Sequence, residues 1–306
     1  MDKIVVTGAT SMLGLALIND AVNHGIKVLA MTRAGSKKIC RLPKSELISI
    51  LECDIDEMEA VQVSNLESDY DVFYHFAWAH TDKTTRNDPV LHEKNIRYAL
   101  DAVNLAHRLG CKKFIGAGSQ AEYGRFEGKL NASTPINPDI AYGMAKYAAG
   151  RLTNLRCKEL GMKHVWIRIL SVYGIYDQPT TMISYAIKEN LAGRTPEFTK
   201  CEQKWDFLFS EDAGTAFRLI GENGKNNKVY CLGSGTARPL ADYVKEINKQ
   251  FSKPEYAGVG IKPYAPMQVM HLCADISELT ADTGFEPKIS FEEGLSKTIE
   301  FWKNQS

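Results

Sequence analysis

The sequence from Thr7 to Gly14 reads TGATSMLG, and it joins an apolar β-branched run, Lys3–Thr7, to a segment with helical spacing, Gly14–His24. Glycine suits such a turn because a side chain would obstruct it and would keep the backbone away from a bound phosphate. Free N–H groups at the start of the helix attract an anion. The stretch therefore predicts the phosphate-binding loop of a dinucleotide, in the first β–α unit of the chain. A strand–helix turn without a ligand is the alternative for the two glycines alone.

The pattern of the first half extends this β–α unit into a larger fold. Short β-branched runs alternate with longer helix-period segments, which is typical of a parallel sheet covered by helices. The predicted strands are Lys3–Thr7, Lys27–Thr32, Leu47–Glu52, Val72–Phe76, Lys113–Ala117 and His164–Ile169. The predicted helices are Gly14–His24, Val90–Leu109 and Tyr142–Leu160. We therefore expect an α/β fold with a Rossmann doubly wound parallel sheet.

We expect two parts in this fold. The Rossmann domain covers residues 1–170, with part of residues 205–235 packed on it, and a smaller C-terminal substrate-binding lobe covers residues 171–306. The pattern after residue 171 is less regular, which is typical of a region that faces a substrate.

The composition excludes several classes of protein. Thirty-seven basic residues balance 37 acidic ones, so no overall field favours nucleic acid or an anionic membrane surface. Seven cysteines are scattered singly without zinc-ligand spacing, which predicts reduced, buried thiols and no metal site. The N-terminal sequence lacks the features of a signal peptide, and no apolar run is long enough to cross a bilayer. We therefore expect a cytoplasmic protein.

The end of the second predicted strand indicates which nicotinamide cofactor binds. A dinucleotide without a 2′-phosphate is usually held there by an acidic residue, whereas a 2′-phosphate requires positive charge. Residues 31–38 read MTRAGSKK and contain no carboxylate. Arg33, with Ser36 and Lys37, therefore favours NADP(H), with NAD(H) as the alternative cofactor. A solvated basic turn would explain the same residues without a ligand.

A set of Ser, Tyr and Lys supplies the chemistry expected beside a nicotinamide. Ser119 follows the fifth predicted strand, and Tyr142 and Lys146 lie on one face of the next helix because they are four residues apart. A neighbouring ammonium and an oxidised nicotinamide both favour the phenolate, so we expect a lowered pKa for Tyr142. A carbonyl that receives hydride becomes an alkoxide, to which Tyr142 can give a proton and Ser119 a second hydrogen bond. These three residues are the predicted catalytic set.

With these motifs in this order, the chain resembles the extended short-chain dehydrogenase/reductases, the NAD(P)-dependent nucleotide-sugar epimerase/dehydratase family. Ser11 replaces the middle glycine of that family's TGxxGxxG loop. The resemblance implies further cofactor contacts after the third and fourth strands and in the segment after Arg168. The predicted cofactor-binding residues are Thr7, Gly8, Thr10, Ser11, Met12, Leu13, Gly14, Arg33, Ser36, Lys37, Asp54, Ile55, Phe76, Ala77, Trp78, Tyr142, Lys146, Leu170 and Val172.

The resemblance also narrows the reaction. Family members that dehydrate a sugar carry an Asp-Glu pair after the catalytic hydroxyl residue, and here those positions are Gln120 and Ala121. The branch that couples epimerisation to reduction uses a cysteine beside its serine, and none lies between Cys111 and Cys157. We therefore expect NADPH-dependent reduction of the C4 ketone of a nucleotide-diphospho-4-keto-6-deoxy sugar. An NAD(P)-dependent nucleotide-sugar 4-epimerase and a non-catalytic NADP(H)-sensing Rossmann protein are the alternatives.

The sequence indicates the substrate-binding residues less clearly than the cofactor-binding ones. The family commonly carries an Arg before the Asp of its R-D-F/Y segment, to bind the substrate diphosphate, whereas this chain has Trp205 before Asp206. Arg194 and Arg238 are candidate replacements, and each is also explained as an ordinary surface residue. The predicted substrate-binding residues are His80, Ser119, Gln120, Tyr123, Ser171, Arg194, Trp205 and Arg238.

The resemblance finally implies a homodimer, in which Val90–Leu109 and Tyr142–Leu160 pair across a twofold axis. One stripe of the first of these helices carries apolar residues at helical spacing, namely Ile96, Ala99, Val103 and Ala106. Burial inside the monomer would explain that stripe equally well. The expected partners are thus a nucleotide sugar and a second copy of the chain, with no nucleic acid and no membrane.

Overall fold

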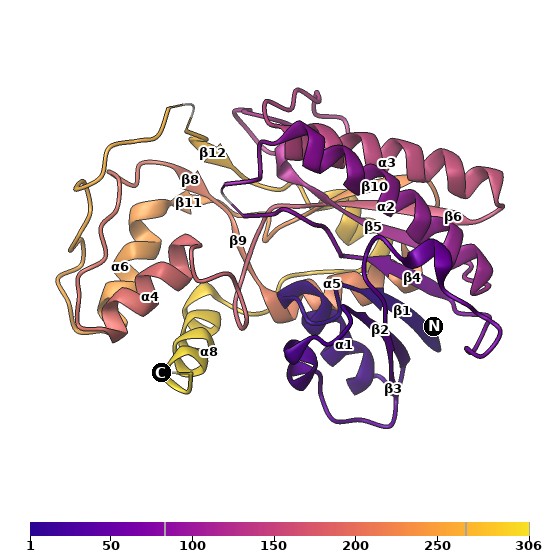
Figure 1. Ribbon diagram of the computed structural model, residues 1–306. Coiled ribbons are helices and arrows are strands. Elements are labelled where there is room, and N and C mark those ends of the chain that lie inside the picture. Colours follow the sequence, from indigo (N-terminus) through magenta and orange to yellow (C-terminus); the bar gives the residue numbers. More distant parts are fainter. Residues whose placement is uncertain (83, 267, 306) are drawn as a thin grey trace.

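The computed structural model describes residues 1–82, 84–266 and 268–305. Within these residues the centre of the protein is a seven-stranded parallel sheet with the order β10-β6-β5-β4-β1-β2-β3 (Figure 1). The strands are β1 (Lys3–Thr7), β2 (Lys27–Thr32), β3 (Ile48–Glu52), β4 (Val72–His75), β5 (Lys113–Ser119), β6 (Lys163–Ile169) and β10 (Lys228–Leu232). The order runs outward from β1 in both directions, as in a doubly wound Rossmann sheet, so the predicted fold class is confirmed.

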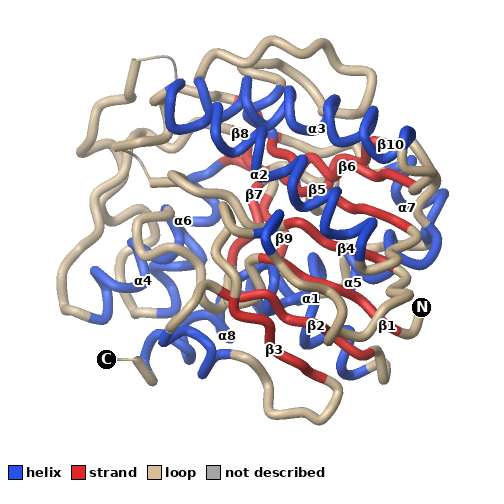
Figure 2. The backbone as a smooth tube through the Cα atoms, turned by 45° about the vertical axis from the view of Figure 1, so that its right-hand side comes forward, coloured by secondary structure: helices blue, strands red, loops and turns tan. Residues whose placement is uncertain are grey.

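Helices cover both faces of this sheet (Figure 2). They are α1 (Met12–Asn23), α2 (Pro89–Arg108), α3 (Ala141–Glu159), α5 (Ser210–Asn223) and α7 (Ser277–Thr283). Because successive side chains of a strand point to opposite faces, Val5 and Phe73 pack with the α2 layer, whereas Ile4 and Tyr74 pack with the α1 and α5 layer. Burying one such side chain contributes about 1.5–3 kcal/mol, so the two layers fix the sheet on which the site is built.

The remaining elements form a smaller lobe beside the carboxyl ends of the strands (Figure 1). A three-stranded sheet has the order β11-β8-β12, and β7 pairs with β9. The elements are β7 (Ser171–Tyr173), α4 (Met182–Leu191), β8 (Lys204–Trp205), β9 (Phe207–Phe209), β11 (Arg238–Pro239), α6 (Leu240–Gln250), β12 (His271–Leu272) and α8 (Phe291–Lys303). Aromatic rings fill the core of this lobe, with the Tyr243 and Phe291 ring centroids 4.6 Å apart.

The structure extends the sequence prediction in two places. β5 continues to Ser119, so this residue ends the strand instead of following it. The seventh strand, β10, comes from the second half of the chain and pairs with β6, and α5 packs against α1. Residues 210–232 thus belong to the body of the sheet, while the division into domains at residue 170 stays a prediction.

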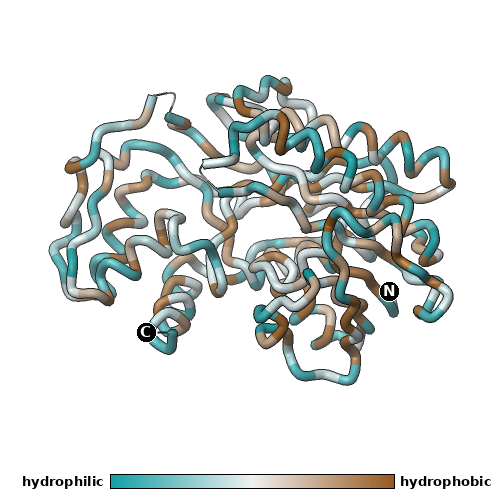
Figure 3. The backbone as a smooth tube through the Cα atoms, in the orientation of Figure 1, coloured by the Kyte–Doolittle hydropathy of each residue, from teal (hydrophilic) through white to brown (hydrophobic). Residues whose placement is uncertain are grey.

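The chain's polar patterning agrees with this layered fold. Figure 3 shows hydrophilic and hydrophobic residues alternating along the outer helices.

Six of the seven cysteines are buried free thiols, but the prediction was wrong for Cys40, which is exposed on the short helix η1 (Lys37–Arg41). In the described ranges of the chain, every helix is too short or too polar to cross a membrane.

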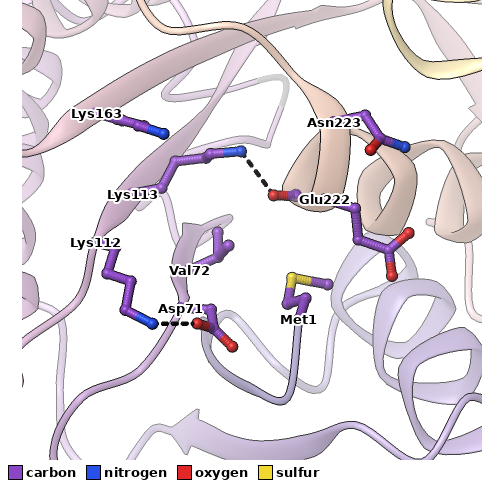
Figure 4. Close-up of a pocket in the computed structure, with 9 residues that line it drawn as sticks. Met1, Asp71, Val72, Lys112, Lys113, Lys163, Glu222 and Asn223 are labelled. Atoms are coloured by element: carbon purple, nitrogen blue, oxygen red, sulfur yellow. Dashed lines mark hydrogen bonds and ion pairs between the residues drawn. The ribbon is translucent and has the colours of Figure 1, made fainter.

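A second cavity lies at the amino-terminal edge of the sheet, and Lys113, one of the residues that line it, has a structural role (Figure 4). Nζ of the buried Lys113 donates hydrogen bonds to carbonyl oxygens at the end of α5, at 2.7 Å to Gly221, 3.2 Å to Gly224 and 3.4 Å to Ile220. The last carbonyls of a helix have no partner within it, so Lys113 caps α5. Burial lowers the pKa of Lys113 to about 8.

Candidate active site

A large cavity of about 1030 Å³ lies between the carboxyl ends of the central strands and the smaller lobe. Its wall includes the TGATSMLG loop at one end and Trp205 and Leu240 of the lobe at the other. Sites for one small molecule usually occupy about 300–1000 Å³, so this cavity is at the upper end of the range for ligand sites. It lies at the sheet edge where doubly wound folds bind their ligands.

The glycine loop has the geometry that a close approach of phosphate requires. Gly8 has φ +66°, and a Cβ there would lie 3.0 Å from the backbone N of Ala77. At Gly14 a Cβ would lie 2.4 Å from the carbonyl oxygen of Gly8. Ser11 Oγ accepts from Gly14 N at 3.1 Å and caps α1, and Ser11 also lines the cavity. The loop and the helix N-terminus thus fit the pyrophosphate of a dinucleotide.

Basic side chains after β2 line part of the cavity wall. Arg33, Lys38 and Arg41 line it together with the apolar side chains of Ile55 and Met58. Ser36 Oγ caps η1 by accepting from Lys38 N at 3.3 Å, and this short helix brings Lys38 and Arg41 to the cavity. Of the three residues named from the sequence, Arg33 lines the cavity, whereas Ser36 and Lys37 do not and Lys38 and Arg41 take their place.

Asp54 also has a different place from the one expected. Its carboxylate accepts from the backbone N of Ala34 at 3.3 Å, and the neighbouring Glu52 accepts from Gly35 N at 3.0 Å. These contacts hold the turn that carries Arg33. Asp54 therefore holds the backbone of the turn that carries Arg33 and does not itself line the cavity, whereas Ile55 does.

Ser119, Tyr142 and Lys146 meet at the inner end of the cavity. Ser119 ends β5, Tyr142 lies in the first turn of α3 and hydrogen-bonds to the side chain of Ser119, and Lys146 follows one turn later. The Lys146 ammonium donates to the carbonyl oxygen of Ala117 at 2.6 Å and lies 3.8 Å from the centroid of the Trp78 ring. The predicted catalytic residues are thus brought together around one point.

The expected effect of Lys146 on Tyr142 is corrected by the structure. Burial raises the pKa of Tyr142 above its ordinary value, against the opposing effects of Arg86 and of the hydrogen bond from Ser119. The Lys146 ammonium is 5.8 Å from the Tyr142 ring, because it is directed toward Ala117 and Trp78. Burial lowers the pKa of Lys146 itself to about 7. The net effect of the protein's own groups is therefore a raised pKa of Tyr142, in which burial outweighs the lowering by Arg86 and Ser119.

Glu122 lies behind Ser119 and faces away from the cavity. It belongs to the short helix η3 (Gln120–Glu122), is fully buried, and accepts from Arg168 Nε at 2.7 Å and from Trp166 Nε1 at 2.9 Å. It also accepts from the backbone N of Ser119 at 2.9 Å. This carboxylate consequently orients the end of β5 and has no open path to a substrate.

Tyr123 was expected to bind substrate, but the structure buries it next to the same network. Its hydroxyl donates to the carbonyl oxygen of Asn131 at 2.6 Å and accepts from Arg168 at 2.9 Å. Only 1% of Tyr123 is exposed, so it supports the loop behind Ser119 and does not reach the cavity.

Arg194 and Arg238 do not reach the cavity either. Arg194 makes two 2.7 Å hydrogen bonds to the Glu189 carboxylate on the exposed end of α4. Arg238 pairs with Glu292 at 3.0 Å and lies 4.3 Å from the Tyr243 ring centroid. Trp205 does line the cavity, where its Nε1 donates to Ser171 Oγ at 2.7 Å.

Most of the remaining predicted residues line the cavity. For the cofactor these are Thr7, Gly8, Thr10, Ser11, Met12, Leu13, Arg33, Ile55, Phe76, Ala77, Trp78, Tyr142, Lys146, Leu170 and Val172. For the substrate they are His80, Ser119, Gln120, Ser171 and Trp205.

Sequence reasoning missed Arg86, Asp177 and Thr181, which also line the cavity. Asp177 Oδ2 accepts from Thr181 Oγ1 at 2.7 Å, and burial raises the pKa of Asp177 to about 6. All three residues lie in connecting segments without a periodic pattern or motif. The one signal in the sequence is that these residues follow β4 and β7, and segments that follow the strands of such a sheet lie at its carboxyl edge.

Comparison with known proteins identifies the family. The model of the NAD-dependent epimerase/dehydratase family matches residues 4–233. The chain belongs to this family. Family members are nucleotide-sugar oxidoreductases and epimerases, which argues against the non-catalytic sensor considered from the sequence.

Relatives agree with this membership over the full length of the chain. The dTDP-glucose 4,6-dehydratase of Xanthomonas campestris pv. campestris is 23% identical, over 97% of this chain and 92% of that protein. The fold is that of the UDP-N-acetylglucosamine 4-epimerase from Methanobrevibacter ruminantium M1, with a TM-score of 0.88 at 22% identity over 100% and 99% of the two chains. The UDP-glucuronic acid 4-epimerase from Bacillus cereus, in complex with UDP-glucuronic acid and NAD, gives 0.85 at 21% identity over 99% and 100%.

Proposed function

We propose that this epimerase/dehydratase family member reduces the C4 ketone of a nucleotide-diphospho-4-keto-6-deoxy sugar with NADPH. The observation that carries the proposal is the joint placement of Ser119, Tyr142 and Lys146 at the inner end of a cavity whose other end is cationic. A bound nicotinamide would supply the hydride. The protein then has to supply one proton and to hold the oxygen on which charge develops.

The side chains at the inner end are suited to that task. Tyr142 gives its phenolic proton to the C4 oxygen, so the ketone, one hydride and one proton become a hydroxyl group. Ser119 donates a second hydrogen bond to the same oxygen, and this contact strengthens as the alkoxide forms. Lys146, whose pKa is about 7, gives a proton back to Tyr142 after the transfer or holds the cofactor ribose.

Dehydration does not fit the residues beside Ser119. Gln120 lines the cavity without an ionisable group, Ala121 is buried, and Glu122 is engaged with Arg168. Among the described residues, the acidic side chains that line the cavity are Asp82, bonded to Thr84 and Thr85, and Asp177, bonded to Thr181. The acid and base that would eliminate water are thus missing from the positions where dehydrating relatives carry them.

The cationic end supports NADPH as the reductant. Arg33, Lys38 and Arg41 all line the cavity, with the Arg41 guanidinium 4.5 Å from the centroid of the Tyr176 ring, and positive charge near the adenosine ribose is what a 2′-phosphate requires. Replacing Arg33 by Asp should weaken NADPH binding by about 1.5–3 kcal/mol, the usual contribution of a hydrogen bond to a charged group. Lys37→Met, on the exposed side of η1, is the matched control and should bind NADPH normally. Equal affinity of the wild-type protein for NADPH and NADH would contradict the cofactor assignment.

A 4-epimerase is the second candidate, and the structural comparison favours it. Two solved structures with nearly the same fold are 4-epimerases, one of them with NAD bound. An epimerase would use the same Ser119, Tyr142 and Lys146 to take up and return the proton of the C4 hydroxyl, while the C4 hydride would pass to a bound oxidised nicotinamide and come back to the other face. It therefore differs from the reductase in consuming no cofactor.

A panel of CDP-, dTDP- and UDP-linked 4-keto-6-deoxy sugars tests the proposal, with NADPH absorbance as the readout. Turnover of at least one member by the wild-type protein, and its loss in Tyr142→Phe, is expected. Absence of NADPH oxidation across the panel, combined with interconversion of 4-hydroxy sugars, would replace the proposal by the epimerase.

We further propose a homodimer through α3, and a cytoplasmic location in which the buried free thiols stay reduced. Of the stripe singled out from the sequence, Ala99, Val103 and Ala106 are fully buried in the monomer and Ile96 is half-buried, so the stripe does not support a dimer. The support comes instead from Leu155 and Met144 on α3, which are 57% and 52% exposed. Light scattering should report a dimer that Leu155→Glu dissociates, whereas Ile261→Glu, at an equally exposed site in the other lobe, should leave it intact. A monomeric wild-type protein would contradict this.

A further inference from the structure

The guanidinium group of Arg86 lies 4.2 Å from the centroid of the Tyr142 ring. Arg86 belongs to the segment between β4 and α2, and it lines the large cavity on the same side as the catalytic residues. A cation at this distance from an aromatic face interacts with the ring directly. Nothing in the motifs of the sequence singles out this arginine.

The backbone of the same segment is docked on the start of α3. The carbonyl oxygen of Arg86 accepts from Tyr142 N at 3.3 Å, and Asn87 Oδ1 accepts from Ala141 N at 2.9 Å. Asp88 Oδ1 in turn caps α2 by accepting from Val90 N at 2.9 Å. These bonds satisfy N–H groups that the helices leave unpaired, and they hold the guanidinium in register with the Tyr142 ring.

The other charged and titratable groups around Tyr142 are less suited to act on it. The rings of His92 and Tyr142 are 5.6 Å apart, and burial lowers the pKa of His92, so that imidazole is neutral near pH 7. The charge of Glu122 is paired with Arg168, and that of Lys146 is directed at Ala117 and lost progressively above pH 7. His80 lines the cavity farther along the same segment. A guanidinium, in contrast, keeps its charge over the whole working range of pH.

We propose that Arg86 is a positioning residue that acts through Tyr142, by placing a permanent positive charge on the face of the phenol ring and so favouring the phenolate. The Lys146 ammonium, which is directed at Ala117 O and the Trp78 ring, is farther from the Tyr142 ring than the Arg86 guanidinium. The inference rests on the proposed function only for the role of Tyr142 in proton transfer. The titration of Tyr142 itself can be measured whether or not a substrate is known.

The direct test is an NMR titration of protein labelled with ¹³Cζ-tyrosine, in the presence of saturating NADP⁺. The chain has 13 tyrosines, and the resonance of Tyr142 is identified by its absence in Tyr142→Phe. Removing the charge in Arg86→Met should raise the titration midpoint of Tyr142 by about 1 pH unit or more. Arg86→Lys should restore at least half of that shift, and Arg151→Met, on the exposed face of α3, should leave the midpoint unchanged.

Two results would overturn the proposal. One is an unchanged midpoint in Arg86→Met, whether or not that variant also shows a raised KM, since Arg86 would then serve the substrate or the loop. The other is an Arg86→Lys midpoint as high as that of Arg86→Met, since packing and not charge would then be responsible.

Kinetics provide a second readout once a substrate is found. Tyr142 donates its proton in the reductive direction, so kcat/KM falls as pH rises through its pKa, and Arg86→Met should move this alkaline limb to higher pH. If no sugar is turned over, the proposed function fails while the NMR titration still decides the role of Arg86.

Discussion

Arg168 Nε donates to Glu122 Oε2 at 2.7 Å, and both side chains are buried directly behind Ser119. Removing one partner of such a pair leaves an uncompensated charge in the interior. We expect Arg168→Met to lower the free energy of unfolding by about 3–5 kcal/mol. The double variant Glu122→Gln/Arg168→Met should regain most of that loss, as measured by urea denaturation. A double variant that is less stable than Arg168→Met would show that Glu122 is not stranded by the single change.

Gly8→Ala tests the close approach of the phosphate loop to the segment after β4. A Cβ at Gly8 would meet Ala77 N at 3.0 Å, whereas at Gly25, which has a similar φ of +73°, it would meet no atom within 4 Å. Gly25→Ala should therefore cost only the backbone strain of about 1–2 kcal/mol and leave dinucleotide binding unchanged. Gly8→Ala should cost more in thermal or urea unfolding and should also weaken dinucleotide binding. Identical behaviour of the two variants would contradict the loop geometry.

Lys146 gives the free protein a defined dependence of stability on pH. Its pKa is about 7 in the folded protein, below the ordinary value of 10.5, so the unfolded chain holds one more proton between these values. The free energy of unfolding should therefore rise with pH in this window, by up to about 1.4 kcal/mol per pH unit from this group. Lys146→Met should remove that part of the slope between pH 7 and 9, whereas Lys158→Met, exposed on the same helix, should retain it. Parallel curves for the wild-type protein and Lys146→Met would be inconsistent with a neutralised lysine.

Tyr142→Phe separates proton transfer from binding. The ring and its contacts with Arg86 and Trp78 are preserved, so the affinity for dinucleotide should stay close to that of the wild-type protein. Turnover should fall by at least the 10²- to 10⁴-fold contribution of a positioned acid. Lys146→Met should reduce both turnover and dinucleotide affinity, because its ammonium is placed to hold the cofactor ribose as well. Tyr142→Phe with most of its activity would mean that another group supplies the proton.

Much of this architecture could be predicted because it depends on local patterns. The continuous apolar runs of β1 and β4 and the glycines of the first turn act within a few residues, and so they are visible in the sequence. The partner of Arg238 is not visible in this way, because Glu292 is 54 residues away and the ion pair depends on how the helices of the lobe pack.

The surroundings of Tyr142, which determine its titration, required the structure for a similar reason. The spacing of Tyr142 and Lys146 places both on one helix face, but only the structure shows that the ammonium turns to Ala117 O and that Arg86 covers the ring. Arg86 comes from a connecting segment without periodicity, so its position depends on the bonds that dock this segment on α3.

The stoichiometry of turnover tests the central claim most directly. The protein is incubated with a CDP-, dTDP- or UDP-linked 4-keto-6-deoxy sugar, and the NADPH consumed is compared with the 4-hydroxy product formed. The proposed reductase predicts one NADPH oxidised for each product molecule, with the NADP⁺ released to solution. Conversion of a 4-hydroxy nucleotide sugar into its C4 epimer, without added reductant and without net change in nicotinamide absorbance, would contradict it.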